Sequence, residues 1–150
     1  MLLCVSGCGN STKDLKATTA DIIIPRTRDC IDVLLTETTV DEIERDKKGI
    51  FFTESWLAFF KQSPMAFDKL VAQYGKAEAE EKFKSIYKGF GNFYIVDTGA
   101  YDVDELKNYL TPLVKMIDGK LTVVKGKYEV LRKMLTGKID EDFRVIKKEV

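Results

Sequence analysis

The clearest pattern of hydrophobic and polar positions lies between residues 93 and 146. Short apolar runs alternate there with stretches whose apolar residues recur at helical spacing. The runs that predict strands are residues 93–96, 113–116, 121–124 and 143–146. The stretches that predict helices are residues 102–110 and 127–135. Their order is β-α-β-β-α-β, which is one compact unit of an α+β domain.

The preceding part of the chain predicts mainly helices. A short apolar run at residues 22–24 stops at Pro25 and predicts a strand. Residues 26–36 predict a helix with Ile31, Leu34 and Leu35 on its inner face.

Three further segments carry helix signals. Thr39 and Glu42 match a capping box and predict a short acidic helix that ends by Gly49. Ser63 and Pro64 predict the start of the next helix, which is followed by a similar pattern over residues 76–88. The aromatic residues of segment 50–90 recur at helical spacing, which is typical of a shared core.

These elements predict the α+β class, with a helical first half packed with the C-terminal β-α-β-β-α-β unit. Residues 1–21 are expected to be a signal remnant and tether. Residues 22–150 are expected to form a single globular domain, with a helical lobe at 26–90 and an α+β lobe at 91–150. A ferredoxin-like split has the same order of elements, but many unrelated functions share that fold.

Charge and composition exclude several functions. The chain has 24 basic and 24 acidic residues and no histidine. The missing imidazole excludes histidine-dependent triads and histidine zinc sites. Residues 26–46 hold seven acids and three bases, whereas residues 119–138 hold six bases and one acid. The basic segment predicts either internal pairing or a binding face.

The cysteines predict no metal site. Three cysteines do not form the paired framework of a secreted domain. A metal bound by Cys4 and Cys8 would need further soft ligands, and we expect no cofactor. Cys30 is expected to be a packed core thiol rather than a nucleophile. No apolar run approaches the roughly 20 residues of a membrane-spanning helix.

The N-terminal residues Val5-Ser6-Gly7-Cys8 resemble the lipobox of bacterial lipoproteins. The resemblance implies cleavage before Cys8 and a lipid on its thiol, although no basic segment precedes the short apolar stretch. It implies a non-enzymatic, immunity- or exclusion-type protein that is anchored outside the bacterial cytoplasm and binds another protein. The alternative is an apolar N-terminal segment that packs on the domain.

The segment from Pro112 to Gly126, with the helical pattern behind it, resembles the N-terminal domain of the ParB partition family. That family has Glu-Arg-Arg after the glycine, where this chain has Lys127-Tyr128-Glu129, so the triphosphate-binding arginines do not carry over. The alternative function is therefore a cytoplasmic nucleic-acid- or nucleotide-binding module. The phosphate-binding and stacking residues of this hypothesis are Lys120, Lys125, Gly126, Lys127, Tyr128, Arg132, Lys133 and Lys138.

A third motif, Asp97-Thr98-Gly99-Ala100, resembles the active-site loop of retroviral-type aspartic proteases. The resemblance implies a catalytic carboxylate at Asp97 that shares a proton with a second copy. The surrounding pattern differs, because that family is almost entirely strand, whereas Asp102 and Glu105 here predict a helix cap directly after the motif. We therefore expect no assembled catalytic set.

Overall fold

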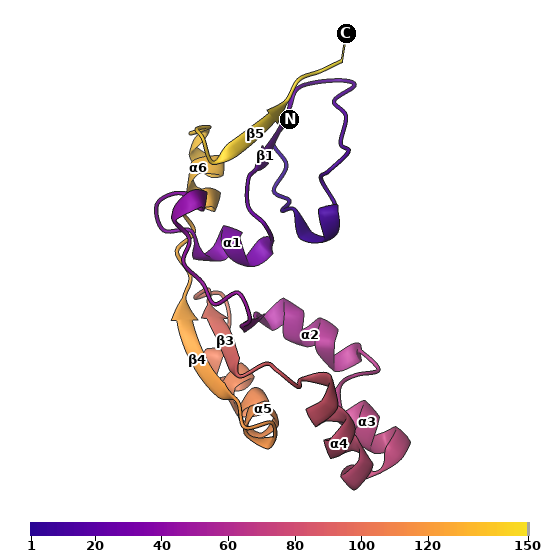
Figure 1. The fold of residues 1–150 in the computed structure, drawn as a ribbon. Helices are drawn as coiled ribbons and strands as arrows, with labels where there is room; N and C mark the ends of the chain where they lie inside the picture. Colours follow the sequence, from indigo (N-terminus) through magenta and orange to yellow (C-terminus); the bar gives the residue numbers. More distant parts are fainter. Residues whose placement is uncertain (150) are drawn as a thin grey trace. The chain divides into compact units, whose positions relative to one another are not determined.

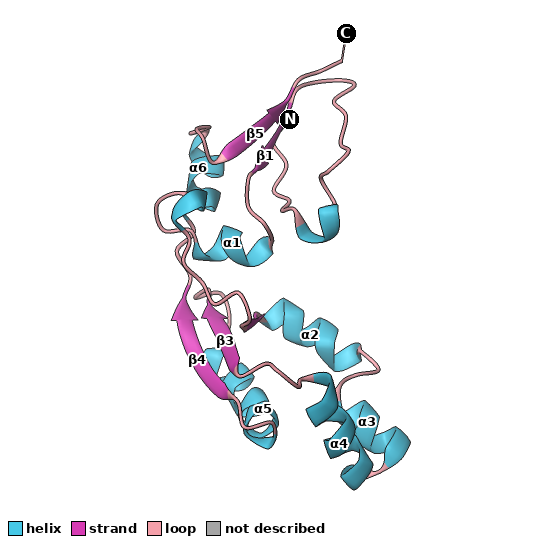
Figure 2. Ribbon diagram, viewed as in Figure 1, coloured by secondary structure: helices cyan, strands magenta, loops and turns pink. Residues whose placement is uncertain are grey.

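The structure is a computed structural model that describes residues 1–149, and the chain divides into two compact units. Unit 1 contains Met1–Glu44 together with the chain from Gly126 onward, and unit 2 contains Arg45–Lys125. Figure 2 shows that both units combine helices with strands, which confirms the α+β class. The units do not coincide with the lobes predicted at 26–90 and 91–150, because unit 1 is built from both ends of the chain.

Unit 2 is a parallel sheet with helical crossovers (Figure 1). Its strands, in spatial order, are β2 (Ile50–Phe52), β3 (Asn92–Asp97) and β4 (Lys120–Lys125). Between β2 and β3 lie α2 (Glu54–Gln62), α3 (Phe67–Tyr74) and α4 (Lys76–Ile86). Helix α5 (Val103–Met116) connects β3 to β4. Parallel neighbours need such long connections, since a tight turn reverses the chain.

One face of this sheet carries the core of unit 2. Phe52 and Ile95 are register partners and point to the same face as Phe93. All three are at most 3% exposed, and they pack with the buried side chains of all four helices. Trp56 stacks on Phe60 with ring centroids 5.3 Å apart. Most of the aromatic residues of segment 50–90 are therefore core, as their spacing predicts, whereas Phe59, Tyr74 and Phe90 are exposed.

Unit 1 has a smaller antiparallel sheet of β1 (Ile22–Pro25) and β5 (Phe143–Ile146). Its helices are α1 (Cys30–Leu35) and α6 (Glu129–Thr136), with 3-10 turns η1 (Cys8–Asn10) and η2 (Val40–Glu42). Figure 1 shows β1 and β5 side by side, although 117 residues of chain lie between Pro25 and Phe143. The pairing ties the two ends of the chain into one unit.

The predicted strand at residues 113–116 is wrong. Helix α5 continues through Pro112 to Met116, and Leu106, Leu110, Leu113 and Val114 are buried along one side of it. Their spacing is that of one helical face, so core packing outweighs the helix-breaking tendency of the proline. The last predicted strand exists, but β5 pairs with β1 and not with the parallel sheet. The β-α-β-β-α-β unit is therefore not formed as one sheet.

Two predicted helix starts are also wrong. Thr39 makes no side-chain cap; the hydroxyl of Thr38 donates to Glu42 instead, and only the 3-10 turn η2 forms. Ser63 is the C-cap of α2, and the next helix begins at Phe67. The Ser63 hydroxyl accepts from the Met65 amide, so it stabilises a turn before the helix.

Candidate functional site

The N-terminal segment lies alongside β1 as a parallel partner. The Ile23 amide donates to the Met1 carbonyl at 2.8 Å, and the Leu3 amide donates to the Ile23 carbonyl at 2.9 Å. Farther along, the Gly7 amide donates to the Thr27 carbonyl at 3.3 Å. These contacts at the two ends of the segment carry Cys8 past Thr27 and toward the start of α1.

Gly7 permits the close approach of the two segments. A Cβ at this position would lie 3.2 Å from the Arg28 carbonyl oxygen and 3.3 Å from that of Thr27. Both contacts are tighter than nearly all real Cβ contacts, and both involve backbone that cannot easily move. A glycine therefore lets the residue that follows it, Cys8, reach α1.

Asp29 and Asp32 fix the other side of the site. The Asp29 carboxylate accepts from the amides of Ile31 and Asp32 and caps α1, so Cys30 becomes its first residue. Asp32 is fully buried and accepts two hydrogen bonds from the Arg28 guanidinium, at 2.7 and 3.0 Å. This paired, bidentate geometry holds the loop before Cys30 in place.

The two segments bring the thiols of Cys8 and Cys30 to one surface groove. Each thiol influences the acidity of the other. The Ser6 hydroxyl lies 3.2 Å from the same sulfur. Cys8 and Cys30 are both exposed, so the pair faces solvent. These residues are the strongest candidate site in the chain.

The surroundings of the two thiols shift their pKa values in opposite directions. The hydrogen bond from Ser6 is the largest influence on Cys8 and, together with the neighbouring Cys30, lowers its pKa below the ordinary value of 9.0. Desolvation raises the pKa of Cys30 above that value, and the neighbouring Cys8 raises it further. Cys8 therefore forms a thiolate at a lower pH than Cys30 does.

The thiol pair opens into a groove of about 510 Å³. Residues from the N-terminal segment, from α1 and from α6 line this groove, which we call the thiol groove. They are Cys4, Val5, Ser6, Cys8, Ser11, Cys30, Val33, Leu34 and Leu131. The prediction that Cys30 is a packed core thiol is wrong, because its side chain lies at this open surface. Burial in α1 instead falls on Asp32 and Val33.

The thiols do not form part of a larger ligand cluster. Within residues 1–149, no three or more Cys, Asp or Glu side chains are placed so that they could hold one metal ion. Structural zinc sites need four such ligands, and the chain has no histidine to complete a set. The chemistry available to Cys8 and Cys30 is therefore that of a pair of thiols.

The residues of the phosphate-binding hypothesis are divided between the two units. Lys120 and Lys125 belong to unit 2, whereas Gly126 and the residues after it belong to unit 1. The Lys125 ammonium lies 2.8 Å from Asp97, and that of Lys127 lies 2.9 Å from Glu37. Arg132 pairs with Glu129 through two nitrogens, at 2.6 and 2.7 Å.

The backbone near Gly126 is also engaged. The amides of Lys127 and Glu129 donate to the carbonyls of Leu34 and Thr36, at the end of α1. A Cβ on Gly126 would lie 2.7 Å from the Tyr128 hydroxyl, so the Tyr128 side chain fills the space beside the glycine. Two of the backbone donors that a phosphate could use here therefore already have partners at the end of α1.

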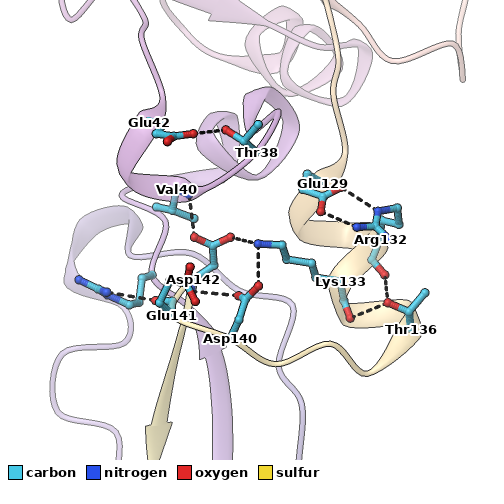
Figure 3. A network of polar contacts seen from close by, with 11 residues as sticks. Thr38, Val40, Glu42, Glu129, Arg132, Lys133, Thr136, Asp140, Glu141 and Asp142 are labelled. Carbon is cyan, nitrogen blue, oxygen red and sulfur yellow. Dashed lines mark hydrogen bonds and ion pairs between the residues drawn. The ribbon is translucent and has the colours of Figure 1, made fainter.

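Lys133 is the most deeply buried of the predicted phosphate ligands. Figure 3 shows its side chain reaching from α6 to Asp140 and Asp142. Burial acts to lower the pKa of Lys133, but hydrogen bonds to the two carboxylates outweigh it, and the pKa lies above its ordinary value. Asp142 also accepts from the Val40 amide at 2.8 Å. Lys133 thus ties together three segments of unit 1 rather than facing a ligand.

Asp97 is the last residue of β3, directly before the connection to α5. One carboxylate oxygen accepts from the Lys125 ammonium at 2.8 Å, and the other accepts from the Gly99 amide at 2.9 Å. These bonds, first that from Lys125, lower the pKa of Asp97. The Asp102 carboxylate caps α5 by accepting from the Asp104 amide. The loop has the contacts of a strand-to-helix connection.

Cys30 and Ser6 are the site residues that sequence patterns missed. Cys8 was singled out through the lipobox resemblance, and Cys30 lies 22 positions farther along the chain. The signal that would have found the pair is the apolar run at residues 2–5, had it been taken as a strand beside residues 22–25. Such pairing, continued in the same register, places Gly7 opposite Arg28 and Cys8 near Cys30.

Comparison with known proteins gives a family and no function. In the described part of the chain, no helix has the length and apolar character that crossing a bilayer requires. No curated protein and no solved structure matches the chain. A family model described as "Protein of unknown function (DUF1638)" matches residues 1–135, a range that includes all of unit 2 and both cysteines of the thiol pair. The chain belongs to the DUF1638 family.

Proposed function

We propose that the protein carries out reversible thiol–disulfide exchange through Cys8 and Cys30. One observation carries the proposal: two exposed thiols, 22 positions apart in the sequence, line the same groove. Two cysteines held near each other are what an intramolecular disulfide requires. The chemistry needs neither a histidine nor a metal, which suits the composition of the chain.

The exchange proceeds in two steps. The Cys8 thiolate attacks one sulfur of a partner disulfide, a new sulfur–sulfur bond forms, and the other partner sulfur leaves as a thiolate. The Cys30 thiol then loses its proton and attacks the Cys8 sulfur, which releases the second partner sulfur. Both released thiolates take up protons. The partner disulfide is reduced to two thiols, and the dithiol is oxidised to the Cys8–Cys30 disulfide.

The unequal acidity of the thiols gives each a role. The attacking sulfur must be ionised and accessible, and Cys8 has the lowered pKa and an exposed side chain. The resolving sulfur must stay protonated until the mixed disulfide has formed, and the raised pKa of Cys30 favours this. Ser6 positions the Cys8 sulfur and stabilises its negative charge by donating a hydrogen bond.

The test is oxidation of the reduced protein by a dithiol–disulfide buffer, followed by intact mass and peptide mapping. The expected product has lost two hydrogens and contains a Cys8–Cys30 cross-link. Cys8→Ser and Cys30→Ser should each abolish this product. Cys4→Ser is the matched control, because Cys4 lines the same groove but has no part in the proposed exchange, and this variant should oxidise as the wild type does.

Formation of a disulfide that contains Cys4, or unchanged mass under oxidising conditions, would contradict the proposal. A trapping experiment separates the two roles. Cys30→Ser should accumulate the mixed disulfide at Cys8, because the second attack is then impossible. Cys8→Ser should accumulate little mixed disulfide at Cys30.

A lipid anchor at Cys8 is a second proposal, and the lipobox-like residues with an exposed Cys8 thiol support it. The two proposals exclude each other, because an alkylated sulfur cannot exchange. Cleavage before Cys8 would also remove the hydrogen bonds of Met1, Leu3 and Gly7 to the segment that begins at Ile23. Intact mass of the protein from membrane and soluble fractions of a bacterial host distinguishes them: a chain that begins at a lipid-bearing Cys8 supports the anchor and ends the exchange proposal.

A further inference from the structure

The walls of the thiol groove are apolar on both sides of the sulfur pair. Val33 and Leu34 project from α1, Leu131 comes from α6, and Val5 belongs to the N-terminal segment. Val5 is 41% exposed although its side chain lines the groove. At about 510 Å³, the groove is large enough for several side chains of a bound molecule.

The charge around the groove disfavours anions. None of its lining residues has a charged side chain apart from the ionisable thiols. Asp29 lies close enough for its negative charge to act on both Cys8 and Cys30. The nearby Arg28 guanidinium is bonded to the buried Asp32 carboxylate. A small anionic disulfide such as oxidised glutathione therefore meets no complementary charge here.

We infer that the thiol groove accepts a disulfide carried by a polypeptide, with aliphatic side chains next to the bonded sulfurs. The inference rests on the proposed exchange reaction and names its substrate class. The aliphatic neighbours of the partner cysteine lie against Leu131, Val33 and Val5, and the partner sulfur faces Cys8. Burial of this apolar surface holds the disulfide at the thiolate.

The experiment compares three disulfides as oxidants of the reduced protein. Two are synthetic peptides with the same disulfide, one flanked by valine and leucine and the other by aspartate, and the third is oxidised glutathione. Stopped-flow measurement gives the second-order rate constant for each. The aliphatic peptide should react about tenfold faster than either anionic disulfide, which is the effect of burying one or two aliphatic groups.

A matched pair of variants on α6 tests where the preference arises. Leu131→Asn alters a groove wall and should remove most of the preference. Leu135→Asn makes the same change on the same helix at a side chain that is 89% exposed and outside the groove, and it should leave the preference intact. Val5→Asn provides a second wall variant in an exposed loop, in case Leu131→Asn unfolds unit 1.

The outcomes separate the inference from the proposed function. Equal rate constants for the three disulfides, or a preference that survives both Leu131→Asn and Val5→Asn, overturn the inference and leave the exchange reaction standing. If none of the three disulfides oxidises the protein, both the inference and the proposed exchange reaction are contradicted. A faster reaction with glutathione identifies a small anionic disulfide as the substrate and overturns the inference.

Discussion

The two units bury different kinds of residue. Unit 2 has one continuous core of twelve buried side chains, all of them hydrophobic. Within the described chain, the buried polar and charged residues all belong to unit 1, and they are Thr27, Asp32, Thr36, Lys133 and Asp142. Unit 2 is thus stabilised mainly by apolar surface removed from water, whereas unit 1 also depends on specific polar pairs.

The different kinds of buried residue match the way in which each unit is built. Short segments from both ends of the chain make up unit 1, and its two smaller hydrophobic clusters contain four and three buried residues. Specific bonds such as Arg28 to Asp32 and Lys133 to Asp142 add the positional definition that small clusters lack. The thiol pair requires that definition, because it forms between two segments held by such contacts. The sheet of unit 2 needs no comparable device.

The largest expected effect is from Phe93→Ala in unit 2. Phe93 is 1% exposed and packs near the rings of Phe52 and Tyr87. Its truncation leaves a cavity and should lower the free energy of unfolding of unit 2 by about 3 to 5 kcal/mol. Urea unfolding followed by the fluorescence of Trp56, the single tryptophan, measures this change.

Phe59→Ala is the matched control. Phe59 lies on α2 and is 73% exposed, so the same truncation should barely move the urea midpoint. Similar shifts for the two variants would mean that the fluorescence transition does not depend on the core we describe. Such a result would also contradict the conclusion that unit 2 is stabilised mainly by its apolar core.

The second effect in size is from Asp142→Ala in unit 1. The change leaves the Lys133 ammonium, whose side chain is 4% exposed, with one carboxylate partner and leaves the Val40 amide without its acceptor. We expect a loss of about 3 kcal/mol in the free energy of unfolding of unit 1. Hydrogen exchange, followed by mass spectrometry on peptides from α6 and β5, measures it locally.

Asp97→Ala makes the same change in an ion pair of unit 2 and is the control. The Lys125 side chain of that pair is 69% exposed, so water replaces the lost carboxylate and the effect should be much smaller. If Asp142→Ala reduced protection in β3 as much as in β5, the two units would unfold together. The two units could then not be described as having separate sources of stability.

Sequence patterns predicted unit 2 better than unit 1. The strands at 93–96 and 121–124 and the aromatic core follow from hydrophobic spacing, because apolar burial dominates there. The apolar run at residues 113–116 predicts a strand, but it continues the buried face of α5 beyond Pro112. The fixed φ of the proline is compatible with a helix, and the packing of Leu113 and Val114 offsets the lost hydrogen bond.

The candidate site could not be predicted from patterns of this kind. Cys30 was expected in the core because Ile31, Leu34 and Leu35 define an apolar face, but α1 buries Asp32 instead. Burial of the charged Asp32 can be explained only when its partner, Arg28, is known to lie beside it. The contact of Cys8 with Cys30 likewise depends on the pairing of two distant segments, which local spacing does not encode.

The acid response of unit 1 is the third prediction. The hydrogen bond from Lys133 lowers the pKa of Asp140 below its ordinary value of 3.8. The stability that Asp140 contributes is therefore present above pH 3.8 and is lost as the pH falls through the folded-state pKa. Exchange protection of α6 should decline on acidification below about pH 4 and should decline less in Asp140→Asn, which starts from lower protection.

At alkaline pH, the stability that Lys133 contributes changes with pH in the opposite direction. Lys133 has a pKa raised above its ordinary value of 10.5, so its contribution is present below pH 10.5 and is lost only as the pH rises through the folded-state pKa. This ion pair should leave α6 protection nearly constant between the two limits. A steep change near neutral pH would contradict the assignment to Lys133 and Asp140.

The smallest expected effect is from Ser6→Ala, and it tests the site rather than the fold. Removing the hydroxyl that lies 3.2 Å from the Cys8 sulfur should move the pKa of Cys8 upward, toward its ordinary value of 9.0. At neutral pH the thiolate fraction falls, so alkylation of Cys8 should slow by about three- to fivefold. The measurement is the rate of iodoacetamide labelling against pH, in a Cys4→Ser background that leaves only Cys8 and Cys30.

Ser11→Ala is the control for that profile. The Ser11 hydroxyl donates to the Ser6 carbonyl at 2.9 Å and makes no described bond to the Cys8 sulfur. Its removal should shift the labelling profile much less than Ser6→Ala does. Stability should be unchanged in both variants, because Ser11 is exposed and Ser6 is only partly buried. If Ser6→Ala leaves the labelling profile of Cys8 unchanged, the neighbouring Cys30, and not Ser6, sets the pKa of Cys8. The role of Cys8 as the attacking thiolate would then depend on the two cysteines alone.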